Sequence, residues 1–200
     1  MKRLIVAIST LLAIVLIPFT LSAITIHIPG DYSTIQEGID EAEDGYIVLV
    51  ADGTYTGDGN QDIDFTGKAI VVISENGPEV TIIDCNGSAS DPHRGFYFHS
   101  GENSTSILSG FKIINGYVTG SLPEENYGGG IYCSESSPTI TNCTVSGNTA
   151  VYSSGGIYCS NSNPTIENCT ISGNSAGSHG GGIYCYESSP PISNCTISGN

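Results

Sequence analysis

Basic residues are scarce in this sequence. The 200 residues contain 5 Lys and Arg against 20 Asp and Glu, which gives a formal net charge of −15 at pH 7. Two of the five basic residues, Lys2 and Arg3, stand at the very start of the chain. Because an acidic surface repels phosphate groups and anionic lipid, we expect no nucleic-acid partner. Unaided binding of a polyanionic sugar is disfavoured for the same reason.

Long apolar runs are absent after the first twenty residues. Residues 4–19 form the one such run; it follows Lys2 and Arg3 and leads to the small residues Ser22 and Ala23. This pattern predicts a secretory signal peptide over residues 1–23, and therefore a secreted or cell-surface protein. An uncleaved membrane anchor is the alternative for this run. No later segment is long and apolar enough to span a membrane as a helix.

Signature motifs of common enzyme classes are also missing. The sequence has no nucleophile elbow, no phosphate-binding loop and no His-rich metal motif. In the repeated part of the chain, no window has apolar residues at the i, i+3, i+4, i+7 spacing of an amphipathic helix. These absences argue against a helical repeat and leave no obvious catalytic centre.

A repeat of 26 residues is the main feature that the sequence does have. The triplet Ile-Tyr-Cys starts at positions 131, 157 and 183, and the triplet Asn-Cys-Thr starts at positions 142, 168 and 194. Prolines at positions 138, 164 and 190 keep the same step. A fixed period of this length indicates stacked units that bury their apolar faces against one another.

Each repeat contains three short runs with the alternation of a β-strand, such as residues 130–133, 138–141 and 143–146. Turn residues separate the runs, so one repeat forms one coil, and parallel coils stack about 4.8 Å apart. The predicted fold is all-β, a right-handed parallel β-helix (solenoid). Asn142, Asn168 and Asn194 fit bends that need left-handed backbone, and their side chains could hydrogen-bond along the axis. A disordered low-complexity tract is the alternative, but the alternation is too regular for it.

The cysteines fall into two columns of the predicted solenoid. One column holds Cys133, Cys159 and Cys185, and the other holds Cys143, Cys169 and Cys195. Stacked positions lie within disulfide distance, but parallel side chains are badly oriented for the required torsion. We expect buried thiols that act as small apolar groups, with a covalent staple as the alternative. Cys85 has no partner in either interpretation.

The rest of the chain divides around these repeats. We expect an N-terminal cap over residues 24–45, irregular coils over residues 46–127 and regular repeats over residues 128–200. The cap contains a strand at 24–28 and a short helix with capping-box spacing from Ser33 to Gln36. Further strands are predicted at residues 46–51, 69–74, 80–85, 96–99 and 106–114. The chain ends at Asn200 inside a repeat, so we expect either further coils beyond it or another cover for this end.

The coil that begins at Phe96 aligns with the first regular repeat, residue by residue. Phe96 corresponds to Ile131, and the segment 108–113 corresponds to the segment 140–145. The coil is nine residues longer than the period; three extra residues lie before its second strand and six lie in the stretch 117–128. Insertions in a solenoid form loops, often on the binding side.

Two segments resemble known families. TIQEGIDEAEDGYIVLVADGTYTG, residues 34–57, resembles the entry module of pectin-active β-helix proteins, the pectate lyase and pectin esterase superfamily. The Gly-Gly-Gly-Ile-Tyr-Cys block is similar to secreted bacterial β-helix repeat proteins, and in style to polymorphic outer-membrane proteins. A pectate-lyase-like activity implies a carboxylate cluster that holds calcium and a basic residue that removes a proton. That catalytic set cannot be placed on this sequence.

One region mixes the groups that such chemistry needs. Asp91, His93, Arg94 and His99 surround the strand at Phe96, in the coil that carries the insertions. A His could act as a general base, and an Arg could hold a carboxylate. Solvated turn residues explain the same cluster.

A second candidate site is a calcium-binding loop. The predicted fold requires no cofactor, so a calcium ion would be an addition to it. Asp58, Asn60, Asp62 and Asp64 place oxygen ligands at alternate positions, as calcium loops do. The segment lacks the Gly at the sixth position and the closing Glu of an EF-hand loop. A polar turn is the alternative.

Tyrosines form the third candidate site. Tyr97, Tyr132, Tyr158 and Tyr184 each lie between two inward residues, so strand alternation points them outward in one column. Packing between neighbouring strands is one interpretation. The other is a platform for a neutral sugar chain, in which case Tyr132 and Tyr158 could be replaced by Ser without loss of the fold.

The sequence therefore favours an exported, acidic, non-catalytic module with a role in adhesion or carbohydrate contact, whose partner is carbohydrate or another surface protein. A polysaccharide lyase or glycoside hydrolase is the alternative.

Overall fold

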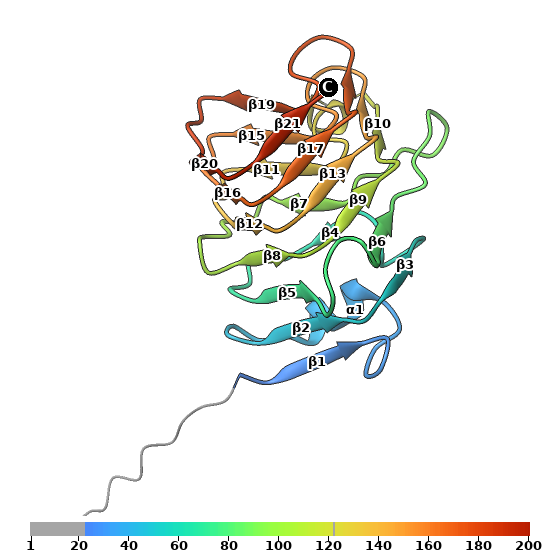
Figure 1. The fold of residues 1–200 in the computed structure, drawn as a ribbon, viewed down its shortest axis with the longest axis vertical. Helices are drawn as coiled ribbons and strands as arrows, with labels where there is room; N and C mark the ends of the chain where they lie inside the picture. Colours follow the sequence, from blue (N-terminus) through green and yellow to red (C-terminus); the bar gives the residue numbers. More distant parts are fainter. Residues whose placement is uncertain (1–22, 122) are drawn as a thin grey trace, which may run out of the picture.

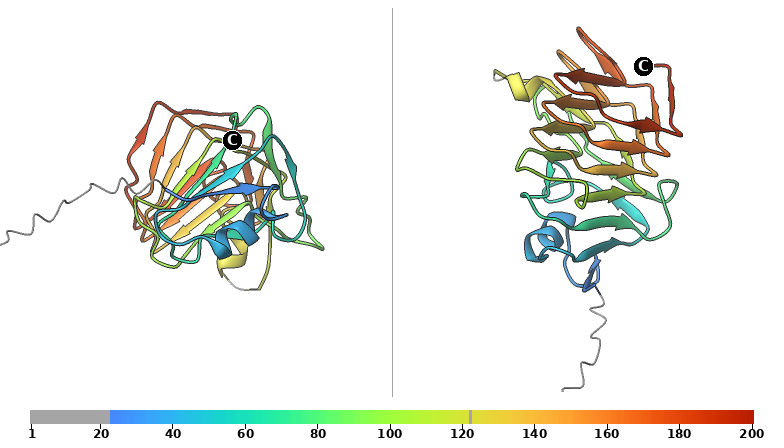
Figure 2. Two further views of the ribbon diagram at one scale, coloured as in Figure 1. Left: turned by 90° about the horizontal axis from the view of Figure 1, so that it is seen from below. Right: turned by 90° about the vertical axis from the view of Figure 1, so that its left-hand side faces the viewer.

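The computed structural model describes residues 23–121 and 123–200 (Figure 1). The chain forms a right-handed parallel β-helix, in which short strands wind around one axis and coils stack on one another (Figure 2). The predicted fold class is confirmed. The predicted signal peptide lies outside the described residues, apart from Ala23 at its end.

The coils build four parallel sheets. Sheet A contains β1 (Thr25–Ile28), β2 (Ile47–Val50), β5 (Val71–Ser74), β8 (Ile107–Ser109), β12 (Thr139–Thr141), β16 (Thr165–Glu167) and β20 (Ile192–Ser193). Sheet B contains β3 (Gly53–Tyr55), β6 (Thr81–Asp84), β9 (Lys112–Ile114), β13 (Thr144–Ser146), β17 (Thr170–Ser172) and β21 (Thr196–Ser198).

The other two sheets complete the coil. Sheet C contains β4 (Ile63–Asp64), β7 (Phe96–Phe98), β11 (Ile131–Ser134), β15 (Ile157–Ser160) and β19 (Ile183–Tyr186). Sheet D contains β10 (Tyr117–Val118), β14 (Thr149–Ala150) and β18 (Ser175–Ala176). Sheet D was not predicted, because its strands are two residues long and too short to show alternation.

The strand pairing follows the 26-residue period. Ile131 pairs with Ile157 and Ile157 pairs with Ile183, so each repeat lies directly over the previous one. The predicted alignment of the enlarged coil is confirmed, because Phe96 pairs with Ile131 and Leu108 pairs with Ile140. Its insertion contains the 3₁₀ helix η1 (Pro123–Asn126), which projects from the side of the stack (Figure 2).

Two expected elements differ in the structure. The single strand predicted over residues 106–114 is two strands, β8 and β9, because Gly110 takes a φ of 83° and turns the chain from sheet A to sheet B. The capping box of α1 (Ile35–Glu41) also lies one residue later than predicted. Thr34 is its N-cap and Glu37 completes it, while the side chain of Gln36 bonds the backbone of Asp64 instead.

The core is a continuous apolar column inside the coils. Aromatic rings fill its middle part: Phe65 lies 4.7 Å from Phe98 between ring centroids, and Phe96 lies 6.0 Å from Phe111. In the regular repeats Ile and Cys occupy the inward positions, and Cys133 pairs in register with Phe98. The helix α1 packs Ile35 and Ile39, both fully buried, against the N-terminal coils.

Asparagines have two separate roles at the bends. Asn142, Asn168 and Asn194 take left-handed backbone, with φ of 53° to 54°, as predicted. The side-chain ladder lies elsewhere, at the end of each repeat. The Asn174 carboxamide oxygen accepts hydrogen bonds from both the backbone N–H and the side-chain amide of Asn148, each at 3.1 Å, and the Asn174 amide donates to Asn200 at 3.0 Å.

Both cysteine columns are present as free thiols. Cys133, Cys143, Cys159 and Cys169 are buried, while Cys185 is exposed and Cys195 is half-buried in the last coil. Cys85 is fully buried, and this burial raises the pKa of its thiol, with further contributions from the charges of Asp62 and Asp84.

These positions predict a two-stage thiol titration. In native protein made of these 200 residues, only Cys185 and Cys195 should react with a thiol reagent, because the other five cysteines are buried. After unfolding without reductant, all seven should react. A smaller count in the unfolded protein would demonstrate a disulfide and contradict the assignment as apolar filler.

The asparagine ladder predicts a large effect on stability. Asn174→Ala should lower the free energy of unfolding by about 2–4 kcal/mol, because it leaves several buried polar groups of the neighbouring coils without partners. Urea unfolding measures the change. Asn163→Ala is the control, since Asn163 is exposed, and should cost less than about 1 kcal/mol. Equal effects of the two substitutions would contradict a stabilising role for the ladder.

Candidate functional site

The outer face of sheet C carries a single column of side chains. Asp64 pairs in register with Tyr97, and Tyr97, Tyr132, Tyr158 and Tyr184 then follow one another on successive strands. The predicted tyrosine column is therefore confirmed as a structural feature. Neighbouring tyrosine rings have centroid distances of 5.0, 5.3 and 5.8 Å, from Tyr97 to Tyr184.

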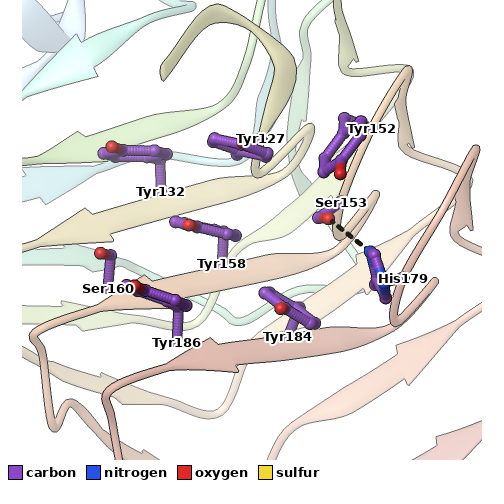
Figure 3. A pocket seen from close by; sticks show the side chains of 9 residues that line it. All are labelled: Tyr127, Tyr132, Tyr152, Ser153, Tyr158, Ser160, His179, Tyr184 and Tyr186. Carbon is purple, nitrogen blue, oxygen red and sulfur yellow. Dashed lines mark hydrogen bonds between the residues drawn. The ribbon is translucent and has the colours of Figure 1, made fainter. Parts of the chain in front are cut away.

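The rings do not form the open platform that alternation suggests. Tyr132, Tyr158 and Tyr184 are stacked at interplanar angles of 15° and 21°, so their faces cover one another along the axis and their edges point outward (Figure 3). Tyr132 and Tyr158 are only 7% and 6% exposed. The expectation that both can be replaced by Ser without harm to the fold is not supported by this burial.

A second column, which sequence reasoning missed, lies beside the first. Tyr127, Ser153 and His179 are 26 residues apart and are linked by isolated bridges between successive coils. Tyr127 stacks on Tyr158 with a centroid distance of 4.6 Å and an interplanar angle of 7°. The spacing was visible in the sequence, but three different residue types at equivalent positions concealed it.

The two columns enclose a groove of about 430 Å³. Its lining consists of six tyrosines, two serines and one histidine: Tyr127, Tyr132, Tyr152, Ser153, Tyr158, Ser160, His179, Tyr184 and Tyr186 (Figure 3). None of these nine described residues carries a carboxylate or a basic side chain other than imidazole. The groove is therefore aromatic and hydroxylated in a chain whose net charge is −15.

The two most exposed rings in the groove belong to tyrosines outside the predicted column. Tyr152 is 49% exposed and Tyr186 is 50% exposed. Tyr186 pairs in register with Ser160, so the last coil has an aromatic ring where the preceding coil has a hydroxyl. Burial raises the pKa of Tyr158 to about 12, because the charged phenolate would lose its solvation in the wall of the groove.

The proposed catalytic residues lie below this groove, in two groups. His93 Nδ1 lies 2.5 Å from a carboxylate oxygen of Asp62, and His93 Nε2 lies 3.2 Å from Asp91. The Asp62 carboxylate also accepts the backbone N–H of Arg94 at 2.8 Å. Since both ring nitrogens of His93 face carboxylates, the ring is held in place and neither nitrogen is directed at open space.

The second group surrounds the ring of Tyr97. His99 stacks on this ring with a centroid distance of 3.9 Å and bonds Asp64 through Nε2 at 3.0 Å. The Arg94 guanidinium lies 4.8 Å from the Tyr97 centroid and 4.9 Å from the Tyr132 centroid. Arg94 and His99 are thus brought together around one ring, as packing partners of the tyrosine column.

A smaller pocket of about 380 Å³ adjoins the first group. Asp62, His93, Arg94 and Glu125 line it, together with the strand end at Val118 and the loop that follows. The insertion supplies Glu125 to this pocket and Tyr127 to the tyrosine groove. The insertion therefore forms part of the lining of both cavities; that it lies on a binding side stays a prediction.

The four residues of the expected calcium loop make hydrogen bonds in different places. The Asn60 oxygen accepts the backbone N–H of Ile35 at the start of α1. Asp62 and Asp64 bond His93 and His99, and Asp58 is exposed. In the described part of the chain, no group of three or more His, Cys, Asp or Glu is placed to hold a metal ion. Calcium binding here stays a prediction that the geometry does not favour.

The model of the right-handed β-helix region matches residues 46–200. The chain belongs to the right-handed β-helix family. No curated protein and no solved structure matches it. Within residues 23–121 and 123–200, no helix is long and apolar enough to cross a membrane. Membership of this family establishes the β-helix and leaves the ligand open, because one scaffold hosts many functions.

The His93 cluster predicts a pH-dependent contribution to stability. Burial lowers the pKa of His93, but the hydrogen bond and charge of Asp62, with those of Asp91, raise it above its usual value overall. A raised folded-state pKa gives stability that is fully present below about pH 6.5 and is lost as the pH rises through the folded-state pKa. The stability difference between the parent and His93→Gln should therefore shrink over that range.

Urea unfolding at several pH values measures this difference. His27→Gln is the control, because the His27 side chain is exposed on β1. A parent-to-variant difference for His93→Gln that stays constant with pH would show that the ion pairs with Asp62 and Asp91 contribute nothing.

Proposed function

We propose that this chain is an exported, non-catalytic β-helix module that contacts carbohydrate through the tyrosine groove. The observation that carries the proposal is the groove itself. Six tyrosines and three small polar or imidazole side chains gather in one cavity of an otherwise strongly acidic chain. Secretion or display on a cell surface follows from the signal-peptide pattern at the N-terminus and belongs to the same proposal.

Sugar rings suit this lining because they present C–H faces and hydroxyl groups together. The half-exposed rings of Tyr152 and Tyr186 offer apolar area for the C–H faces. The hydroxyl groups at the outward edges of the stacked tyrosines, with Ser153 and Ser160, offer hydrogen-bond donors and acceptors. The groove runs across three successive coils, which favours a chain of sugars over a single one.

Charge narrows the class of glycan. With 20 acidic residues in the chain, a polyuronate or sulfated glycan is repelled, while an uncharged glycan is not. Another surface protein is the alternative partner, and a tyrosine-rich patch is compatible with it, since aromatic residues are enriched in protein interfaces.

A polysaccharide lyase or hydrolase remains the second candidate function. The pocket beside Asp62, His93 and Arg94 supports it, as does the resemblance of residues 34–57 to pectin-active proteins. The geometry argues against it, because the His93 ring lies between two carboxylates and Arg94 packs on tyrosine rings. A general base needs a nitrogen directed at its substrate.

Replacing the two exposed rings should abolish most of the glycan binding. Tyr152→Ser with Tyr186→Ser should weaken the binding of a neutral glycan by about tenfold, because two stacking surfaces are lost. The substitutions keep the fold, since the equivalent positions in neighbouring coils are Ser178 and Ser160. A neutral-glycan array followed by calorimetry on the best ligand provides the measurement.

Two controls accompany this test. Val80→Ser removes an exposed apolar side chain from the earlier coils and should leave binding unchanged. Incubation of the parent protein with the same glycans should release no new reducing ends. Unchanged binding by the double variant would show that the glycan contacts another part of the protein. Release of reducing ends would favour the polysaccharide lyase or hydrolase.

A further inference from the structure

The tyrosine column already holds one cation of the chain itself. The Arg94 guanidinium lies 4.8 and 4.9 Å from the ring centroids of Tyr97 and Tyr132, within the range of a cation–π interaction. Tyr132 is also part of the groove lining. Tyrosine rings on the outer face of sheet C therefore already bind a positively charged group.

Further along the column, the described residues place no lysine or arginine against the remaining rings; the His179 imidazole lies 5.4 Å from Tyr184 and 5.9 Å from Tyr152 between ring centroids. Only two other Lys or Arg residues lie in the described part of the chain. Lys68 donates to the carbonyl oxygens of Ile39 and Asp40 at the end of α1, and Lys112 lies on β9 in sheet B. The exposed rings of Tyr152 and Tyr186 thus present their π surface without a lysine or arginine of the chain among the nine lining residues.

Negative charge lies next to the same end of the groove. Glu135 follows β11 directly and Glu187 follows β19 directly, and both carboxylates are exposed. The backbone N–H of Glu135 bonds Ser160, and β19 pairs Tyr186 with Ser160, so both turns lie at the edge where Ser160 and Tyr186 line the groove. The two glutamates lie in the turns beside the groove and are not among its nine lining residues.

We propose that the groove prefers a glycan that carries a positively charged ammonium group, that is, an amino sugar with a free or alkylated amine. This inference rests on the proposed carbohydrate contact and specifies its substrate class. The sugar ring stacks on Tyr152 or Tyr186, and the ammonium group lies over an aromatic face toward Glu187. The net charge of −15 increases the local concentration of such a ligand.

The test compares two tetrasaccharides that differ only in the groups on the nitrogen atom of each sugar. One is built of N-acetylglucosamine and is neutral; the other is its N,N,N-trimethylglucosamine counterpart, whose charge does not change with pH. Calorimetry at pH 7.5 and low salt should show about three- to tenfold tighter binding of the cationic ligand. Raising the salt to about 0.5 M should reduce this ratio, because exposed charges are then screened.

Matched variants locate the effect. Glu187→Gln should weaken binding of the cationic ligand about two- to threefold and leave the neutral ligand unaffected, since it removes one unit of nearby charge. Glu79→Gln makes the same change of net charge on an exposed residue before sheet B strand β6, and should change neither. An effect of equal size in both variants would assign the preference to the net charge of the chain and overturn the role of the groove.

The outcomes separate this inference from the proposed function. If the neutral ligand binds as tightly as the cationic one, and Tyr152→Ser with Tyr186→Ser weakens both, the carbohydrate contact stands and the cation preference is wrong. If neither ligand binds, and the neutral-glycan array is also negative, the carbohydrate contact itself is wrong.

Discussion

In-register pairing of parallel strands at a period of 26 residues is the constraint on which the rest of this structure depends. Each coil takes its main-chain hydrogen bonds from its neighbours, so residues at equivalent positions must share the same environment. Inside, this favours the same small or branched side chain at every level, as in the Ile and Cys columns. At the end of each repeat it places Asn148, Asn174 and Asn200 in one ladder, which satisfies buried backbone groups that a corner would otherwise leave without partners.

The same constraint shapes the outer face of sheet C. Identical residues in register stack on each other, and the stacked tyrosines therefore cover their own ring faces. Exposed aromatic surface arises where one coil differs from the next, as where Tyr186 replaces Ser160. Arg94 and the insertion that carries Tyr127 are further departures from the repeat. Regular positions thus build the scaffold, and irregular positions build the groove.

This division explains what could be predicted from the sequence. The period, the inward Ile and Cys, the left-handed Asn142 and the tyrosine column all follow from alternation combined with a fixed step. Sheet D and the split at Gly110 escaped prediction because two-residue strands and a single glycine leave little local pattern. The groove was not predicted because of its second wall, which consists of Tyr127, Ser153 and His179. These residues occupy equivalent positions in successive coils, but their side chains differ in chemistry, so the sequence shows no obvious column. Whether Tyr132 is packed or open could not be decided from the sequence, because alternation gives the direction of a side chain and says nothing of what lies against it.

The second wall of the groove determines how the groove lining would change if a repeat were lost or duplicated. Tyr127, Ser153 and His179 occupy equivalent levels of three successive coils, whereas the interior of the regular coils is nearly the same at each level. Loss or duplication of one 26-residue unit by recombination would leave the strands hydrogen-bonded and the core filled, because the joined ends match. It would, however, bring a different pair of wall residues together beside the tyrosines. The lining of this groove can therefore change by one whole coil at a time, while the strand pairing and the core are kept.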